Sequence, residues 1–126
     1  MMKQIGFLAA AVGACTLAQA DNLKDYPTSL RVEFVLNCMR DRQGTEYELM
    51  NKCSCALDSL ARRFTVDQFV EALTTADAVT IAGERGAALR DNEQAQKLAR
   101  RFRAAVKDAE IGCFLRQPGE TGEDKK

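Results

Sequence analysis

The chain has 126 residues, and its 18 basic side chains (Lys plus Arg) are balanced by 18 acidic ones, so the formal net charge is zero. This balance leaves no net field that would attract nucleic acid or an anionic membrane surface. Hydrophobic residues make up 46% of the chain and charged residues 29%, which is the composition of one ordinary globular domain. The chain contains no histidine, which excludes the usual general base, the commonest metal ligand and the C-x-x-C-H haem-attachment motif.

The first 20 residues have the three regions of a secretory signal peptide. A lysine-containing start is followed by an apolar run over 5–14 and then by the small-residue site A-Q-A. We therefore predict cleavage after Ala20, export to the periplasm, and a mature chain that begins with a short lead over 21–27. The alternative is a lipobox, V-G-A-C, in which Cys15 would carry a lipid anchor. The apolar run is too short to span a bilayer, so no transmembrane helix is expected.

Two helices are predicted after this lead. Pro27 favours the start of the first helix, over about 28–41. Thr45 followed by Glu48 is a capping-box signature, and it opens the second helix, over about 46–63. The apolar positions at helical spacing, which we assign to the buried sides, are Leu30, Phe34, Cys38, Tyr47, Met50, Cys53, Leu57, Leu60, Ala61 and Phe64, with Val35 and Met39 widening the first stripe.

Two further helices are predicted in the second half of the chain. Thr65 followed by Gln68 is another capping box, for a helix over about 66–79. Asp91 opens the last helix, over about 91–113. The positions assigned to their buried sides are Phe69, Val70, Leu73, Ala76, Ala95, Leu98, Phe102, Ala105, Val106, Ala109 and Cys113.

These four segments predict an all-α fold. Amphipathic helices joined by short connectors bury their apolar stripes against each other, which favours a small four-helix domain over 28–116, built of two helical hairpins. The polar, glycine-containing tail over 117–126 is predicted to be disordered. We find no internal repeat and no alternation long enough to build a sheet.

Four cysteines remain once Cys15 is removed or lipidated: Cys38, Cys53, Cys55 and Cys113. An even number in an exported chain predicts two structural disulfides. Cys53 and Cys55 should not bond to each other, because residues two apart on a helix point about 200° apart. We lean towards Cys38–Cys53 with Cys55–Cys113, since Cys53 lies nearer the turn of the hairpin; the exchanged pairing stays open.

Three other uses of sulfur are weaker. A zinc site would need C-x2-C pairs and a fourth ligand that the spacing does not provide. Cys53 and Cys55 are a candidate thiol redox pair. The thiols together with Met39 and Met50 are a candidate Cu(I) site, because soft donors select that ion. Structural bridges and core packing of both methionines are favoured, so no metal or cofactor is expected.

Charged side chains give no catalytic site. We find no nucleophile paired with a base, which predicts a non-enzymatic protein. The basic residues Arg62, Arg63, Lys97, Arg100, Arg101, Arg103 and Lys107 are read as a solvated face, with protein docking as the alternative. The carboxylates Asp21, Asp25, Asp41, Glu46 and Glu48 lack the loop pattern of a calcium site.

The segment from Gly83 to Gly86 is the candidate recognition site. Gly83 and Gly86 flank the charged pair Glu84 and Arg85, and Arg90 follows shortly after. Glycines permit backbone conformations that other residues resist, and loops on rigid scaffolds often hold recognition residues. We predict a partner-facing loop here; the competing interpretation is a flexible connector.

Three stretches together resemble a known group of proteins. They are L-R-V-E-F-V-L-N-C-M at 30–39, C-S-C-A-L-D at 53–58, and G-E-R-G followed by R-D at 83–91. Across residues 28–114 they resemble small exported four-cysteine proteins of Gram-negative bacteria that are associated with periplasmic quinoprotein alcohol or methanol oxidation systems. The resemblance implies a cellular context and carries no activity.

The function expected from the sequence is that of an exported, non-enzymatic accessory or binding protein. It would dock on a periplasmic protein, within a quinoprotein oxidation system if the resemblance is followed. A periplasmic immunity protein that neutralises a toxin fits the same size, bridges and helicity, and is the alternative.

Overall fold

The computed structural model describes residues 22–40 and 42–119. None of the helices in this part of the chain is both long enough and apolar enough to cross a membrane. Outside it lie the predicted signal peptide over 1–20 with Cys15, the carboxylates Asp21 and Asp41, and residues 120–126 of the predicted tail.

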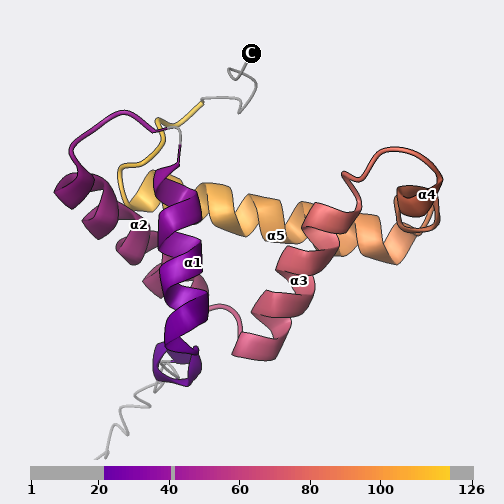
Figure 1. Cartoon of the computed structure of the whole chain (residues 1–126), viewed down its shortest axis with the longest axis horizontal. Coiled ribbons are helices and arrows are strands. Elements are labelled where there is room, and N and C mark those ends of the chain that lie inside the picture. The colour runs from indigo at the N-terminus through magenta and orange to yellow at the C-terminus, as the bar shows by residue number, and fades with distance from the viewer. Residues whose placement is uncertain (1–21, 41, 120–126) are drawn as a thin grey trace, which may run out of the picture.

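The described residues form an all-α domain, as predicted, without a strand among them (Figure 1). The predicted fourth helix is α5, and a short additional helix, α4, precedes it. In Figure 1, α1 and α2 lie at one end of the molecule and α4 lies at the other, along α5. The elements are the 3-10 turn Asn22–Asp25 and the helices α1 Thr28–Met39, α2 Glu46–Ala61, α3 Val66–Ala78, α4 Glu84–Arg90 and α5 Glu93–Gly112.

The helix starts follow the capping chemistry of the sequence with two changes. Thr65 and Gln68 form the complete predicted box, each side chain accepting a hydrogen bond from the other residue's backbone N–H. The Thr45 side chain caps α2 as predicted, but the Glu48 carboxylate pairs with Lys52 and does not complete the predicted box. The predicted start at Asp91 is wrong by one residue, because the side chain of Asn92 caps α5; an asparagine amide oxygen performs this role as well as a carboxylate does.

Two disulfides tie the helices together, with the pairing that the sequence favoured. Cys38 at the end of α1 is bonded to Cys53 in α2, and Cys55 in α2 is bonded to Cys113 just after α5. The two near-adjacent cysteines therefore fix opposite flanks of α2. The first bridge holds the α1–α2 hairpin, and the second joins that hairpin to the α3–α5 pair.

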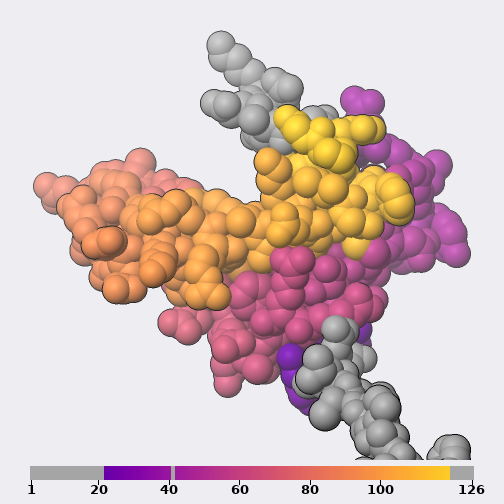
Figure 2. All heavy atoms as spheres, turned by 180° about the vertical axis from the view of Figure 1, so that it is seen from behind, coloured from indigo at the N-terminus to yellow at the C-terminus, as the bar shows by residue number. Residues whose placement is uncertain are grey.

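The core centres on the fully buried ring of Phe69 in α3. It packs against Tyr26, Phe34 and Phe102, with ring centroids 5.3, 5.8 and 5.5 Å away. Phe64 joins the cluster through Phe102 at 5.8 Å. The tilted and edge-to-face geometries are those that aromatic quadrupoles favour. Figure 2 shows α5 crossing the back of the molecule above α3. These two helices carry Phe102 and Phe69, and the short lead before α1 carries Tyr26.

Three residues predicted to lie on buried sides are exposed instead. In α2, Tyr47 is 75% exposed and Met50 is also exposed, and in α3, Val70 is 44% exposed. The core-facing side of α2 begins at Leu49 and continues through Cys53. Apolar residues occupy more than one face of the N-terminal half of α2, so helical spacing alone selected the wrong stripe there.

Burial of Tyr26 makes folding sensitive to high pH. Its hydroxyl donates a hydrogen bond to the Phe64 carbonyl at 3.0 Å, and desolvation raises the pKa of Tyr26 from 10.0 to about 12. Because the pKa of Tyr26 is higher in the folded state than in the unfolded state, its contribution to the free energy of unfolding is fully present below pH 10. This contribution is lost as the pH rises through about 12. We expect a late phase in the phenolate absorbance, accompanied by falling stability. The Tyr26→Phe variant should lack that phase, and a late phase that survives the substitution would contradict the assignment.

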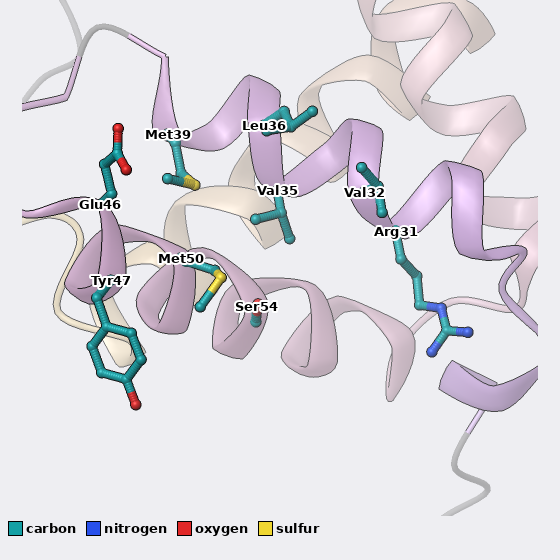
Figure 3. Close-up of a pocket in the computed structure, with 9 residues that line it drawn as sticks. All are labelled: Arg31, Val32, Val35, Leu36, Met39, Glu46, Tyr47, Met50 and Ser54. Atoms are coloured by element: carbon teal, nitrogen blue, oxygen red, sulfur yellow. The ribbon is translucent and has the colours of Figure 1, made fainter.

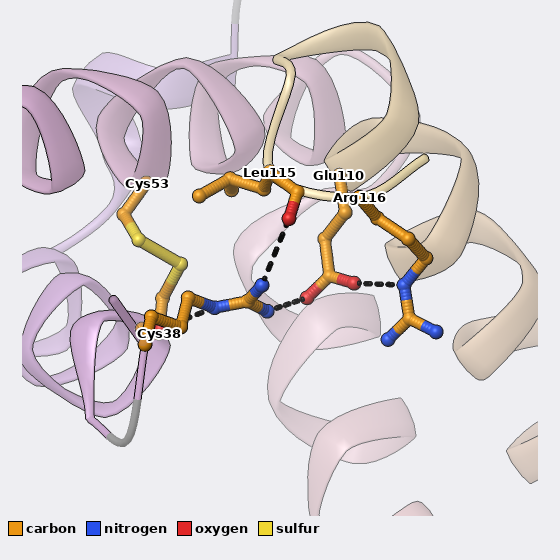
Figure 4. Close-up of a disulfide and its surroundings, with 6 residues drawn as sticks. Cys38, Cys53, Glu110, Leu115 and Arg116 are labelled. Carbon is orange, nitrogen blue, oxygen red and sulfur yellow. Dashed lines mark hydrogen bonds and ion pairs between the residues drawn. A yellow bond between two sulfur atoms is a disulfide. The ribbon is translucent and has the colours of Figure 1, made fainter. Parts of the chain in front are cut away.

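The buried carboxylate of Glu110 joins three parts of the fold (Figure 4). It accepts a hydrogen bond from Arg42 at 2.5 Å and one from Arg116 at 2.9 Å. Arg42 also donates to the carbonyls of Cys38, at 2.7 Å, and Leu115, at 3.2 Å. One guanidinium therefore connects the end of α1, the last turns of α5 and the segment that follows α5.

Candidate functional site

The predicted recognition loop is in part a helix. Gly83 has a φ of 79° and precedes α4, which begins at Glu84. The expectation of a loop over 83–90 is therefore wrong beyond Gly83. The two glycines led to the prediction of a loop, because glycine lowers helix propensity by about 1 kcal/mol and the helix has only seven residues. Glu84 and Arg85 are exposed in its first turn.

Gly86 and Arg90 are accounted for by packing within this segment. Gly86 is buried, and a Cβ atom added to it would lie 2.1 Å from the Ile81 carbonyl oxygen, so only glycine fits there. The Arg90 guanidinium donates hydrogen bonds to the carbonyls of Ile81 and, at 2.8 Å, Gly83. It holds the connector in place, which leaves the neighbouring pair Glu84 and Arg85 as the outward-facing charges of the predicted site.

Within the described residues, the sulfur chemistry considered for the sequence has no free thiol to use. All four cysteines of the described chain are in disulfides, and no cluster of three or more Cys, Asp or Glu residues suited to a metal ion occurs in that part. Met39 and Met50 face a shared groove, described below, instead of the core. They have no thiolate beside them.

The basic face of α5 is partly engaged by its own fold. Arg103 donates to the Ala76 carbonyl at 2.7 Å, and Arg63 of the connector after α2 pairs with Asp108 at 3.3 Å. In α2, Glu48 pairs with Lys52 at 2.6 Å. The two ion pairs are exposed contacts of the kind that contribute little stability. None of these contacts brings several basic side chains together at one site.

An apolar groove lies on the surface between α1 and α2 (Figure 3). It has a volume of about 630 Å³. Four of the large apolar side chains that the described residues leave exposed line it, including Leu36 at 59%. A contiguous exposed apolar patch on a small protein marks an interaction surface, whereas single exposed apolar residues are ordinary. The lining residues are Arg31, Val32, Val35, Leu36, Met39, Glu46, Tyr47, Met50 and Ser54.

The charges of the groove lie at its two ends. Figure 3 shows Arg31 at one end and Glu46 at the other, with the apolar side chains between them. The Nε atom of Arg31 is buried and has no hydrogen-bond partner within the described chain, and Nη2 of the same guanidinium donates a long hydrogen bond, 3.4 Å, to the Thr28 hydroxyl. No ion pair of Glu46 occurs within the described chain. The groove can bury an apolar face and orient it by one charge at each end.

A second hollow, of about 520 Å³, lies between α3 and α5. Its rim carries Arg103, Lys107 and Glu110. Arg103 and Glu110 already have partners within the fold, so two of these three charged groups are engaged by the protein itself.

The sequence contained a signal for the groove that the helix assignment did not use. Leu30 and Phe34 form one apolar stripe on α1, and they pack against the core. Val32 and Leu36 belong to a second stripe on the same helix. A helix that is apolar over so much of its surface is usually covered on both sides. The two apolar stripes on the twelve residues of α1 therefore indicate that one face of the helix packs on the core and the other binds a partner.

Comparison with protein-family models, with curated proteins and with solved structures found no match to this chain. The geometry of the groove and the resemblance noted in the sequence are the two sources for a functional proposal.

Proposed function

We propose that this chain is an exported, non-enzymatic protein-binding module that docks through the α1–α2 groove. The observation that carries the proposal is the concentration of exposed apolar side chains, Val32, Leu36, Tyr47 and Met50, in a single groove. Leaving such side chains in water is unfavourable by about 25 cal/mol per Å² of apolar surface. Covering them with a partner recovers that free energy.

The shape and chemistry of the groove favour an amphipathic helical face as the ligand. Two helices that run side by side form a trough into which a third helix can lay its apolar stripe, a recurring mode of peptide recognition. Met39 and Met50 suit this role because their unbranched, polarizable side chains adapt to the shape of a ligand. The Cys38–Cys53 bridge fixes the two walls relative to each other, which lowers the conformational entropy lost on binding.

Export is part of the proposal, and the two disulfides support it because such bridges persist in oxidising compartments. The signal peptide over 1–20 would direct the chain there. The resemblance to four-cysteine proteins of periplasmic quinoprotein oxidation systems gives the context in which an accessory role is to be sought. Glu84 and Arg85, on α4 at the other end of the molecule (Figure 1), remain available for a separate contact.

Site-specific photocrosslinking in the cell envelope tests the groove. A photoreactive amino acid replaces Leu36 in one strain and Val70 in another; both positions are exposed apolar sites on helices, and only Leu36 lines the groove. We expect discrete protein adducts from position 36 and none from position 70. Absence of an adduct at position 36, or equal labelling at both positions, would contradict the proposal.

A further inference from the structure

We propose that the α1–α2 face of a second copy covers the groove. The protein is then a two-fold symmetric dimer joined through α1 and α2. This inference rests on the proposed function, because it names the partner of the same site. It follows from three properties of the groove: an uncovered helix face, the spacing of its apolar residues, and the placement of its two charges.

The first property is that α1 lacks a partner on one side. None of its twelve residues is fully buried. Leu30 and Phe34 reach the core, and the Cys38–Cys53 bridge fixes the end of the helix. Because a helix of this length is marginal in water without tertiary packing, covering the second face of α1 would stabilise it.

The second property is the spacing of the uncovered residues. On α1 they lie at positions i, i+3, i+4 and i+7, the seam through which helices pack in bundles and coiled coils. On α2 the facing residues are Tyr47, Met50 and Ser54. Two hairpins that meet through this face would form an intermolecular four-helix arrangement. The seam on α1 consists of Val32, Val35, Leu36 and Met39.

The third property selects a second copy as the occupant. Among the described residues that line the groove, Arg31 and Glu46 are the charged ones, and they lie at opposite ends (Figure 3). A two-fold axis that lies in the interface and crosses the middle of the groove at right angles to its length exchanges the two ends of the groove, so it places each Arg31 against Glu46 of the other copy. Such an interface is isologous and closes at two subunits. It supplies a carboxylate for the Arg31 guanidinium and a cation for Glu46.

The pairing leaves the rest of the molecule accessible. The far end of the α3–α5 pair, with α4 and its exposed Glu84 and Arg85, lies away from the α1–α2 face (Figures 1 and 2). Two such ends would point outwards from one dimer. A further protein that bound Glu84 and Arg85 would find the same site on each copy of the dimer. Its avidity would therefore depend on dimer formation.

Sedimentation of the protein purified after export tests the inference. We expect a concentration-dependent shift from the mass of one chain to twice that mass, with a midpoint on the order of micromolar. Leu36→Glu should weaken self-association at least about tenfold, because it buries a charge in the seam. Val70→Glu, the same substitution at an exposed position outside the groove, should leave it unchanged. Thermal melts of each variant establish that the monomer is folded.

A charge exchange separates a second copy from every other ligand. Arg31→Glu alone places two carboxylates together at each end of the dimer, and Glu46→Arg alone places two guanidiniums together; each should weaken the dimer about fivefold or more. The double variant Arg31→Glu/Glu46→Arg restores both pairs within one chain and should recover the wild-type affinity to within about threefold. A double variant that is as weak as the single ones would overturn the two-fold arrangement.

The outcomes for the dimer and for the proposed function are distinct. A wild-type protein that stays monomeric, together with position-36 adducts to a different polypeptide, would overturn the dimer and leave the docking function in place. Adducts of twice the chain mass support both. A monomer that gives no adduct at position 36 would overturn both.

Discussion

Removing the Cys55–Cys113 bridge should lower the free energy of unfolding by about 4 kcal/mol. The bridge connects residues 58 apart, and in the chain-entropy model a loop of that length greatly restricts the denatured chain. For a domain of this size the loss corresponds to a melting temperature about 20 °C lower. The measurement is thermal unfolding of the Cys55→Ala/Cys113→Ala variant under non-reducing conditions, followed by far-UV circular dichroism.

The shorter bridge provides the control. Cys38→Ala/Cys53→Ala opens a loop of 15 residues, worth about 3 kcal/mol in the same model. Its effect should be concentrated in α1, which has no fully buried residue to hold it, and amide exchange should accelerate there first. If the long bridge is removed and the melting temperature changes by only a few degrees, the denatured chain is already compact and the entropic account is wrong.

The features that sequence reasoning predicted well are local. Thr45, Thr65 and Gln68 are capping residues whose chemistry acts within one helical turn, and they placed the starts of two helices correctly. The separation of about 200° between Cys53 and Cys55 on a helix excludes a bond between them and sends them to different partners. It left two pairings open, and the position of Cys53 nearer the turn favoured the one that the structure has.

The features that it missed depend on contacts between distant segments. Tyr26 was placed in a short lead, yet its ring meets Phe69, more than forty residues further along the chain. Met50 and Val70 were assigned to the core because spacing identifies an apolar residue without identifying which face meets the rest of the protein. The groove follows from the same ambiguity, since only the packed structure shows which of the two stripes on α1 remains uncovered.

Glu110 is the clearest case of a residue whose role sequence could not indicate. It lies near the end of an amphipathic helix among other charged residues, and its sequence neighbours give no sign that it is buried. Its partners, Arg42 and Arg116, come from a connector and from the segment after α5. Their guanidiniums converge on one carboxylate only when both disulfide-bonded hairpin ends have come together.

Replacing this carboxylate should cost about 3 kcal/mol. Glu110 is 8% exposed, and Glu110→Ala removes the acceptor of two charge-assisted hydrogen bonds, from Arg42 and Arg116. Each such bond contributes about 1.5 to 3 kcal/mol, and the loss of one partner leaves buried charge without compensation. Urea unfolding of Glu110→Ala should show a lower midpoint with an unchanged slope, because stability falls while the surface exposed on unfolding stays the same.

Asp108→Ala is the matched control for this substitution. Asp108 lies on the same helix, two residues earlier, and forms the exposed pair with Arg63 at 3.3 Å, so its loss should cost less than about 1 kcal/mol. Glu110→Gln retains one carbonyl acceptor and the shape of the side chain, and it should fall between the two. If Glu110→Ala proves no more destabilising than Asp108→Ala, the cluster around Glu110 is solvated in solution and does not hold the end of α1 against α5.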